Sequence, residues 1–382
     1  MTRLLAALAL VLTATAALAQ PEAGRREWPN TDFSRSAVDF AEIVSGGPPK
    51  DGIPVIEAPW FRPARDETRL DPRESMMSYA PGSAPARAYP IRYLMWHEIV
   101  NEVVAAVPNA VTYCPLCNSD MAFDARIDGV RHTFGVWGKL RFSDMVMYDR
   151  PPESWWQQAI GEGIVGRYTG RTLTALPAWM ESWQAFREAH PDGFVMDEPD
   201  WRRAYGRNLS IGYDRSRRPF LYSGEDPLHG IPPLARVARV GDRAWSLERL
   251  REERRIEEAG VTLEWRSGQV SALDSGTIAG GREVGDVLVR DARGRDVPYD
   301  LPFAFVFHAF YPKGHGCSGA VGSANVIPAP ARRRRFCGWG GKENDVPVRP
   351  IDRSRMAIAL GPSMRTPGPA PSMRRAGGPL EA

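Results

Sequence analysis

The sequence predicts a mainly β protein (a β-rich α+β chain) made of two divergent β-rich halves with short helices and a disordered C-terminal tail. Three observations support this fold class. An Asp-Gly pair separates two runs of alternating apolar and polar residues, glycines divide the following sequence into short segments, and a weak internal repeat relates residues 50–200 to residues 201–313. Alternation with a period of two is typical of half-buried strands, which is why these segments indicate β-structure.

The N-terminus has the pattern of a secretory signal peptide over residues 1–19. Arg3 supplies a positive charge, residues 4–16 are almost wholly apolar, and Ala17-Leu18-Ala19 provides the small residues that signal peptidase requires. The apolar run is too short to span a bilayer comfortably as a permanent anchor. We therefore expect cleavage after Ala19 and a periplasmic or secreted location.

The first half is expected to follow an irregular lead-in over residues 20–49. Apolar spacing predicts a short helix over residues 91–100, and Asp128-Gly129 predicts a tight hairpin because both residues tolerate a positive φ. Residues 145–148 are predicted to form a further strand. A helix is predicted over residues 180–189, and His190-Pro191 should end it because proline disfavours helix in the preceding residue.

The second half is predicted from the repeat. Residues 87–94 resemble residues 243–250, residues 183–186 resemble 305–308, and His190-Pro191-Asp192 resembles Tyr311-Pro312-Lys313. Residues 112–117 align with residues 263–268, so only the first copy contains cysteines. Residues 314–382 are rich in Arg, Pro, Gly and Ser with little apolar periodicity, which predicts a disordered tail that includes Cys317 and Cys337.

The composition excludes several classes of partner. A formal net charge of +3 over 382 residues does not indicate a nucleic-acid-binding protein. No segment after the signal peptide reaches the roughly 18 apolar residues that a membrane helix requires, so no stable membrane span is expected. Four cysteines in so long a chain do not make a disulfide scaffold.

The segment Cys114-Pro115-Leu116-Cys117 is the most informative chemical feature of the sequence. Two thiols at this spacing can bind a soft or borderline metal ion, such as copper or zinc, or cycle between dithiol and disulfide with a redox partner. They can also form a static disulfide, which is the default outside the cytoplasm. In that alternative the protein is a non-catalytic binding module.

His97 and Met147 are the candidate partners of the two thiols. His97 lies in Trp96-His97-Glu98, upstream of the pair, and could be a third ligand or a base for a thiol. Met147 lies on a predicted strand and could add a thioether, the ligand that together with thiolate and imidazole suits Cu(I). The methionines and the absence of a second CxxC or HxxxH arm favour copper over zinc.

Catalytic signatures are missing from the sequence. A thioredoxin-like site needs a helix directly after the first cysteine, whereas the residues after Cys117 indicate a strand and hairpin. There is no GxSxG, HExxH or phosphate-binding loop. An enzyme that uses Glu98, His97 and Asp144 is a third hypothesis, supported only by their proximity in sequence, so whether the protein is an enzyme stays open.

Several segments together resemble the bacterial domain-of-unknown-function 3179 family. They are the opening Asp51-Gly52-Ile53-Pro54, the segments Ala86-Arg87-Ala88-Tyr89-Pro90 and Trp96-His97-Glu98-Ile99-Val100-Asn101, Val111 to Cys117, Phe134-Gly135-Val136, Ser143 to Arg150, and His190-Pro191. The resemblance covers residues 50–312 and is weaker in the second half, and Asn118 stands where the family commonly has glycine. It implies an exported or membrane-attached protein and supports treating His97, Cys114 and Cys117 as one site, without assigning an activity.

Overall fold

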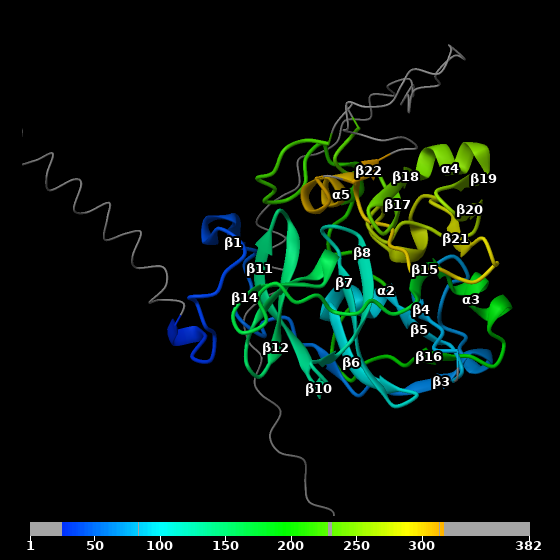
Figure 1. Cartoon of the computed structure of the whole chain (residues 1–382). Coiled ribbons are helices and arrows are strands. Elements are labelled where there is room, and N and C mark those ends of the chain that lie inside the picture. Colours follow the sequence, from blue (N-terminus) through cyan, green and yellow to red (C-terminus); the bar gives the residue numbers. More distant parts are fainter. Residues whose placement is uncertain (1–24, 83, 228–230, 313, 317–382) are drawn as a thin grey trace, which may run out of the picture.

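The computed structural model describes residues 25–82, 84–227, 231–312 and 314–316. Its elements are mostly strands joined by a few short helices, which confirms the predicted fold class (Figure 1). The predicted signal peptide and cleavage position lie outside the described residues, as does the predicted tail beyond residue 316. Among the described residues, no helix is long and apolar enough to cross a membrane.

The framework of the first half is a five-stranded sheet in the order β15-β4-β5-β16-β3. Its strands are β3 (Phe61–Pro63), β4 (Ser75–Tyr79), β5 (Arg87–Pro90), β15 (Ala178–Ser182) and β16 (Phe194–Met196). The 3₁₀ turn η2 (Ala64–Asp66) follows β3. Strand β16 runs parallel to β5, whereas β4 pairs antiparallel with both of its neighbours.

A helix and a second sheet follow β5 directly. Helix α2 (Ile91–His97) leads into a four-stranded sheet ordered β2-β6-β7-β8, made of β2 (Ile56–Glu57), β6 (Ile99–Val104), β7 (Val107–Cys114) and β8 (Ser119–Asp124). The prediction of a helix over residues 91–100 is wrong at its end. Glu98 adopts a left-handed backbone with φ of 57°, which ends the helix and starts β6.

A third sheet, formed by four strands inserted between β8 and β15 together with β1 from the lead-in, lies at the left in Figure 1. It is ordered β1-β11-β12-β13-β14 and consists of β1 (Ile43–Ser45), β11 (Thr133–Arg141), β12 (Asp144–Arg150), β13 (Trp155–Gln157) and β14 (Glu162–Val165). The predicted Asp128-Gly129 hairpin is present between β9 (Arg126–Ile127) and β10 (Val130–Arg131). The 3₁₀ turn η3 (Gln158–Ile160) joins β13 to β14.

The predicted irregular lead-in is ordered where the structure describes it. The 3₁₀ turn η1 (Phe40–Glu42) precedes β1, which pairs with β11. Trp28 is fully buried and packs edge-on against Trp137 and Tyr148. Burial of one such aromatic side chain contributes on the order of 2 kcal/mol, which explains why this segment is held against the inserted sheet.

Helix α3 (Trp183–Ala189) begins three residues later than predicted. Met180 belongs to β15, and the side chain of Ser182 accepts a hydrogen bond from the backbone N–H of Ala185, which caps the helix. The helix ends at His190 as predicted.

The second half lies across the top of Figure 1. Its elements are η4 (Tyr213–Arg215), β17 (Val237–Val240), β18 (Arg243–Ser246), α4 (Leu247–Glu253), β19 (Arg255–Glu258), β20 (Val261–Arg266), η6 (Ile278–Gly280), β21 (Asp286–Asp291), α5 (Ala304–Phe310) and β22 (His315–Gly316). They form the sheets β17-β18-β22 and β19-β20-β21. Because β22 pairs with β18, the fold extends past residue 313, where the tail was predicted to begin.

The internal repeat is visible in individual backbone hydrogen bonds, which make Trp183 and Ala304 equivalent, so the predicted match of residues 183–186 with 305–308 is wrong by one residue. In the first half, Trp183 N–H donates to the carbonyl of Glu74 at 2.8 Å, and in the second half Ala304 N–H donates to the carbonyl of Ala235 at 2.7 Å. The β5–α2 unit matches the β18–α4 unit at the predicted offset, and β22 runs parallel to β18 as β16 runs parallel to β5. The two halves therefore share one topology, with the inserted sheet added to the first.

The predicted alignment around the cysteines is wrong by one residue. Tyr113 N–H donates to the carbonyl of Glu98 at 2.8 Å, and Trp265 N–H donates to the carbonyl of Arg254 at 2.9 Å. Glu98 and Arg254 share the same left-handed conformation, with φ of 57° and 65°. Cys114 therefore corresponds to Arg266, because the second hairpin is shorter than the first.

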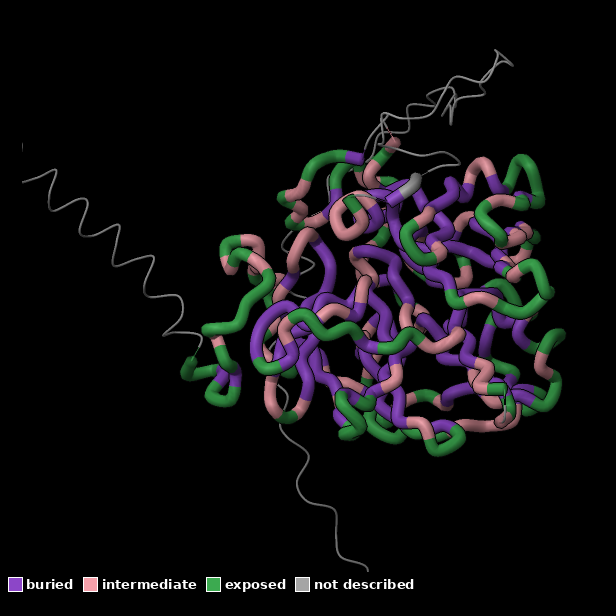
Figure 2. The backbone as a smooth tube through the Cα atoms, in the orientation of Figure 1, coloured by how far each residue is buried: buried purple, intermediate pink, exposed green. Residues whose placement is uncertain are grey.

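Each half contacts the start of the last helix of the other half. The carbonyl of Cys117, after β7, accepts from Phe303 N–H at 3.0 Å, just before α5. Asp286, at the start of β21, accepts from Ser182 N–H at 2.5 Å, just before α3. One hydrophobic cluster with residues from both halves fills the interior, where buried segments concentrate in Figure 2. The turn after β7 is thus fixed between the two halves.

Asn118 should be important for stability because it combines a left-handed backbone with a contact between the halves. Its φ is 50°, and its buried Nδ2 donates to the carbonyl of Leu301 at 2.7 Å. We expect Asn118→Ala to lower the free energy of unfolding by about 3 kcal/mol, from the strained backbone and the lost hydrogen bond. Urea unfolding of the metal-free protein measures this change.

Asp128→Ala is the matched control, because Asp128 has a similar φ of 51° but lies exposed in a hairpin turn. The Asp128→Ala variant should lower the free energy of unfolding by only about 1 kcal/mol. Equal losses in the two variants would show that the Asn118–Leu301 contact does not stabilise the protein.

Candidate metal centre

The two cysteines flank the turn that joins β7 to β8. Cys114 is the last residue of β7 and pairs with Ser119, the first residue of β8. Cys117 N–H donates to the carbonyl of Cys114 at 3.3 Å, which closes the turn. Both cysteines are buried, with 2% and 0% of their surface exposed.

Asp144, the first residue of β12, completes a group of three potential ligands. One ligand atom from each of Cys114, Cys117 and Asp144 lies within 4.8 Å of the other two. The Cys117 thiol donates to Asp144 Oδ1 at a distance of 2.8 Å. Both cysteines are free thiols in the structure.

The carboxylate of Asp144 is held in this orientation by its second oxygen. Oδ2 accepts from Gln157 Nε2 at 2.6 Å and from the backbone N–H of Ala159 at 3.0 Å. Oδ1 is thereby directed at the thiols. Contacts of this kind orient the ligands of metal sites and raise their affinity.

Gln158 supports the turn from the same side. Its Nε2 donates to Thr112 Oγ1 at 2.9 Å, and this residue is buried on β7. Sequence reasoning missed both Gln157 and Gln158. The available signal was two adjacent glutamines after Trp155-Trp156, because amides in an apolar segment require buried partners.

Burial raises the pKa of every acidic group in this centre. It is the largest cause for Cys114 and for Cys117, whose thiols are also disfavoured as thiolates by the neighbouring Asp144 carboxylate. Burial raises the pKa of Asp144 to about 6 despite the hydrogen bonds from Cys117, Ala159 and Gln157. A cation would reverse these shifts, because it favours the charged form of each group.

Glu98 is a fourth acidic group beside the centre. It caps α2 with its left-handed backbone, and burial, followed by repulsion from Asp144, raises its pKa to about 8. Its charge in turn contributes to the raised pKa of Cys114. The side chain keeps partial exposure because it faces a cavity.

A cavity of about 110 Å³ borders the turn between the cysteines. Most of its lining is apolar and comes from distant parts of the chain; it includes Pro48, Met95, Leu116, Met145, Leu209 and Phe220. The lead-in closes one side, where Gly138 has φ of 77° and lies so near Pro48 that a Cβ atom would clash with the proline carbonyl. The cavity therefore lies beside the turn that carries the cysteines, which are not among its lining residues.

The structure does not bring His97 into the group. Its Nδ1 lies 2.7 Å from the carbonyl of Pro54, and its Nε2 lies 2.6 Å from the hydroxyl of Tyr205. Burial lowers the pKa of the imidazole to about 4, so the ring is neutral and holds these two segments together. Asp144, and not His97, lies with the two thiols in this group.

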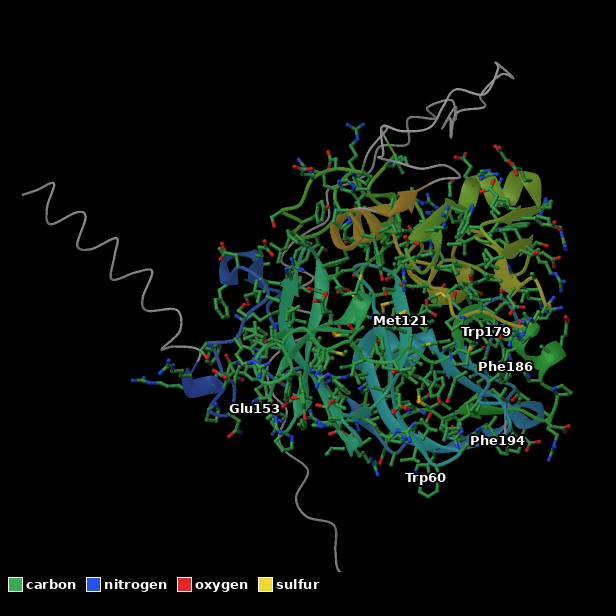
Figure 3. All side chains as sticks on the ribbon, in the orientation of Figure 1. Trp60, Met121, Glu153, Trp179, Phe186 and Phe194 are labelled. Carbon is green, nitrogen blue, oxygen red and sulfur yellow. The ribbon has the colours of Figure 1, made fainter. Side chains whose placement is uncertain are left out.

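Met147 lies in the hydrophobic interior with no exposed surface. It is three residues after Asp144 on β12, and alternation along a strand directs the two side chains to opposite faces. Another methionine, Met121 on β8 (labelled in Figure 3), has its sulfur 3.4 Å from Arg239 Nη2 and so contacts the second half. A thioether ligand from Met147 stays a prediction.

Comparison with known proteins gives a family without an assigned activity. Residues 50–314 match the family described as "Protein of unknown function (DUF3179)". This range agrees with the resemblance over residues 50–312 that the sequence motifs indicated. No curated protein and no solved structure matches the chain.

The raised pKa of Asp144 predicts a dependence of stability on pH. The folded-state value of about 6 lies above the ordinary value of 3.8. Between these values the unfolded chain loses its proton first, so the free energy of unfolding falls as pH rises from about 4 to about 6 and stays lower above that range. The total decrease in the free energy of unfolding is about 3 kcal/mol, since one pKa unit corresponds to about 1.4 kcal/mol.

Asp144→Asn should remove this part of the decrease, because the amide has no proton to lose. Denaturant unfolding of the metal-free, reduced protein at pH 4 and pH 8 measures it. The exposed Asp66→Asn variant should behave like the parent protein. An Asp144→Asn variant with the full decrease would contradict the account of this carboxyl group.

Proposed function

We propose that this chain, which belongs to the DUF3179 family, binds a divalent zinc-type metal ion through Cys114, Cys117 and Asp144. The observation that carries the proposal is the mutual proximity of their ligand atoms, within 4.8 Å. Ligand atoms bonded to one tetrahedral zinc ion at about 2.0 to 2.3 Å lie about 3.3 to 3.8 Å from each other, so shifts of about 1 Å bring the three atoms to bonding positions.

The donor set favours zinc over the copper that the methionines suggested. Two thiolates and a carboxylate suit a borderline ion, whereas Cu(I) prefers soft ligands throughout. Gln157 and Ala159 donate hydrogen bonds to the second carboxylate oxygen of Asp144. Hydrogen bonds of this kind orient the ligands of metal sites. Copper would need Met147 to reach the thiols from the other face of β12.

The setting that we propose is the periplasm or the exterior of the cell, on the strength of the signal-peptide pattern over residues 1–19. In an oxidising compartment two nearby thiols form a disulfide unless something protects them. A bound ion would supply that protection, because it holds both sulfurs as ligands.

Metal uptake tests the ligand set. The reduced protein should bind one equivalent of Zn²⁺, measured by competition with a chromogenic chelator. Cys114→Ser, Cys117→Ser and Asp144→Asn should each weaken binding by at least about 100-fold, because each removes a ligand from a three-ligand site. Equal uptake by the parent and the Cys117→Ser variant would refute the proposal.

His97→Gln and Met147→Leu are the controls, because both residues belonged to the site that the sequence predicted. Both variants should keep zinc affinity within about threefold, provided that circular dichroism shows an intact fold. Loss of zinc with His97→Gln, at unchanged fold, would show that our ligand set is wrong.

Thiol–disulfide exchange with a partner is a second candidate function. It is favoured by the hydrogen bond of 2.8 Å between the Cys117 thiol and Asp144, since a carboxylate in this position can accept the proton of a thiol. Against it stand the burial of both sulfurs and the upward shift of both thiol pKa values, because reactive cysteines are exposed and acidic.

Thiol labelling separates the two functions. The native metal-free protein at pH 7 should react with a thiol reagent at least about 100-fold more slowly than the protein unfolded in guanidinium chloride, because thiolate and access are both lacking. Rapid labelling of one native cysteine, slowed by Asp144→Asn, would instead support thiol–disulfide exchange.

A further inference from the structure

The cavity beside the cysteine turn has walls from three separate parts of the chain. Gly46 and Pro48 come from the lead-in, Leu116 comes from the turn itself, and Leu209 and Phe220 come from the start of the second half. Its volume of about 110 Å³ is smaller than the roughly 150 Å³ of an engineered cavity that binds benzene, a six-membered ring. It therefore suits a single ring smaller than benzene.

The cavity borders the metal centre, although the two cysteines and Asp144 are not among its lining residues. Pro115 and Leu116, which line it, are the two residues between the cysteines, and the carboxyl group of Glu98, also on its wall, interacts electrostatically with Asp144 and Cys114. Three protein ligands leave one position open on a tetrahedral ion, as in catalytic zinc sites, whereas structural zinc sites use four. An open position on this side would face the cavity.

Glu98 is the carboxylate on the cavity wall, and its side chain has no ion-pair partner in the part of the chain that the structure describes. Lys139 also lines the cavity, but its ammonium lies over the Trp137 ring, 5.6 Å from the ring centre, and forms no ion pair with Glu98. Because the Glu98 side chain is partly exposed and lies on the cavity wall, it is available to form a hydrogen bond with a molecule in the cavity.

The internal repeat shows that this chemistry is confined to one half. Arg254 has the backbone conformation of Glu98, and its guanidinium lies over the Trp265 ring at 4.4 Å. Arg266 stands where the first half has Cys114. Both halves have a residue with positive φ between the helix and the following strand, Glu98 in the first and Arg254 in the second. At these equivalent positions, the first half combines a glutamate with a cysteine, whereas the second half has two arginines.

We propose that the cavity binds a small, largely apolar molecule that places a lone-pair donor on the open position of the ion and donates an N–H or O–H to Glu98. This inference rests on the metal site proposed above and names the class of ligand for it. Apolar walls, the size of the cavity and the unpaired carboxylate each match one part of such a molecule.

Imidazole is a suitable probe because it has both features, a nitrogen lone pair and an N–H on the opposite side of the ring. The experiment uses the full-length protein loaded with Co²⁺, whose absorption spectrum reports coordination. The thiolate-to-cobalt band measures the ion content of each variant, and each response to imidazole is normalised to bound cobalt. We expect a saturable change in the visible bands as imidazole is added.

Two variants and one analogue identify the cavity as the binding place. Glu98→Gln should weaken imidazole binding by about tenfold, because a hydrogen bond to a carboxylate that the bound ion keeps charged is replaced by a weaker one to a neutral amide. N-methylimidazole, which lacks the N–H, should bind the parent weakly and show little difference between parent and Glu98→Gln. Leu209→Trp, which fills the cavity from a wall outside the metal centre, should abolish the response.

The outcomes distinguish the two proposals. A thiolate-to-cobalt band without any response to imidazole, or a response equal in the parent, Glu98→Gln and Leu209→Trp proteins, overturns the ligand inference and leaves the metal site intact. Absence of the thiolate-to-cobalt band from the parent protein refutes the metal site, and the ligand inference with it.

Discussion

The hydrogen bond from Phe303 N–H to the carbonyl of Cys117 is the contact on which the rest of the site depends. It joins the cysteine turn of the first half to the start of α5 in the second half. Asn118 adds a contact to the carbonyl of Leu301, and Asp300 accepts from the hydroxyl of Ser119 at 2.8 Å and from Asp120 N–H at 3.1 Å. A turn with a left-handed residue is thereby held rigid in the interior, where water cannot satisfy its polar groups.

The inserted sheet provides what the repeated framework lacks. Strand β12 places Asp144 beside the thiols, and β13 and η3 supply the glutamines that hold the carboxylate and the turn. The outcome is a group of acidic side chains whose burial opposes their ionisation. Such a group is stable when neutral and is also prepared for a cation, whose charge would offset the cost of burying thiolates and a carboxylate together. The second half, with Arg254 and Arg266 at the equivalent points, has neither the sheet nor the acids.

Local patterns in the sequence predicted much of the fold. The Asp128-Gly129 hairpin, the end of α3 at His190 and the match of β5–α2 with β18–α4 all depend on residues close in sequence, and the structure confirms them. The errors arose where the backbone changes direction unexpectedly. Glu98 ends α2 early, and the shorter second hairpin shifts the alignment at the cysteines by one residue.

The site itself was only half predictable. The thiols were identified by their spacing, but His97 was grouped with them because it is near in sequence, whereas its ring holds Pro54 and Tyr205. Asp144 is 27 residues from Cys117 and reaches it only through the pairing of the inserted sheet, which no local pattern reveals. Gln157 was missed for the same reason, since its role exists only once β13 lies beside β12.

X-ray absorption at the zinc edge of the zinc-loaded protein tests the central claim most directly. The account predicts two sulfur neighbours at about 2.3 Å and oxygen neighbours at about 2.0 to 2.2 Å, with one sulfur lost in Cys114→Ser and in Cys117→Ser. A first shell without sulfur, or one in which imidazole nitrogen replaces the carboxylate oxygen, would contradict it.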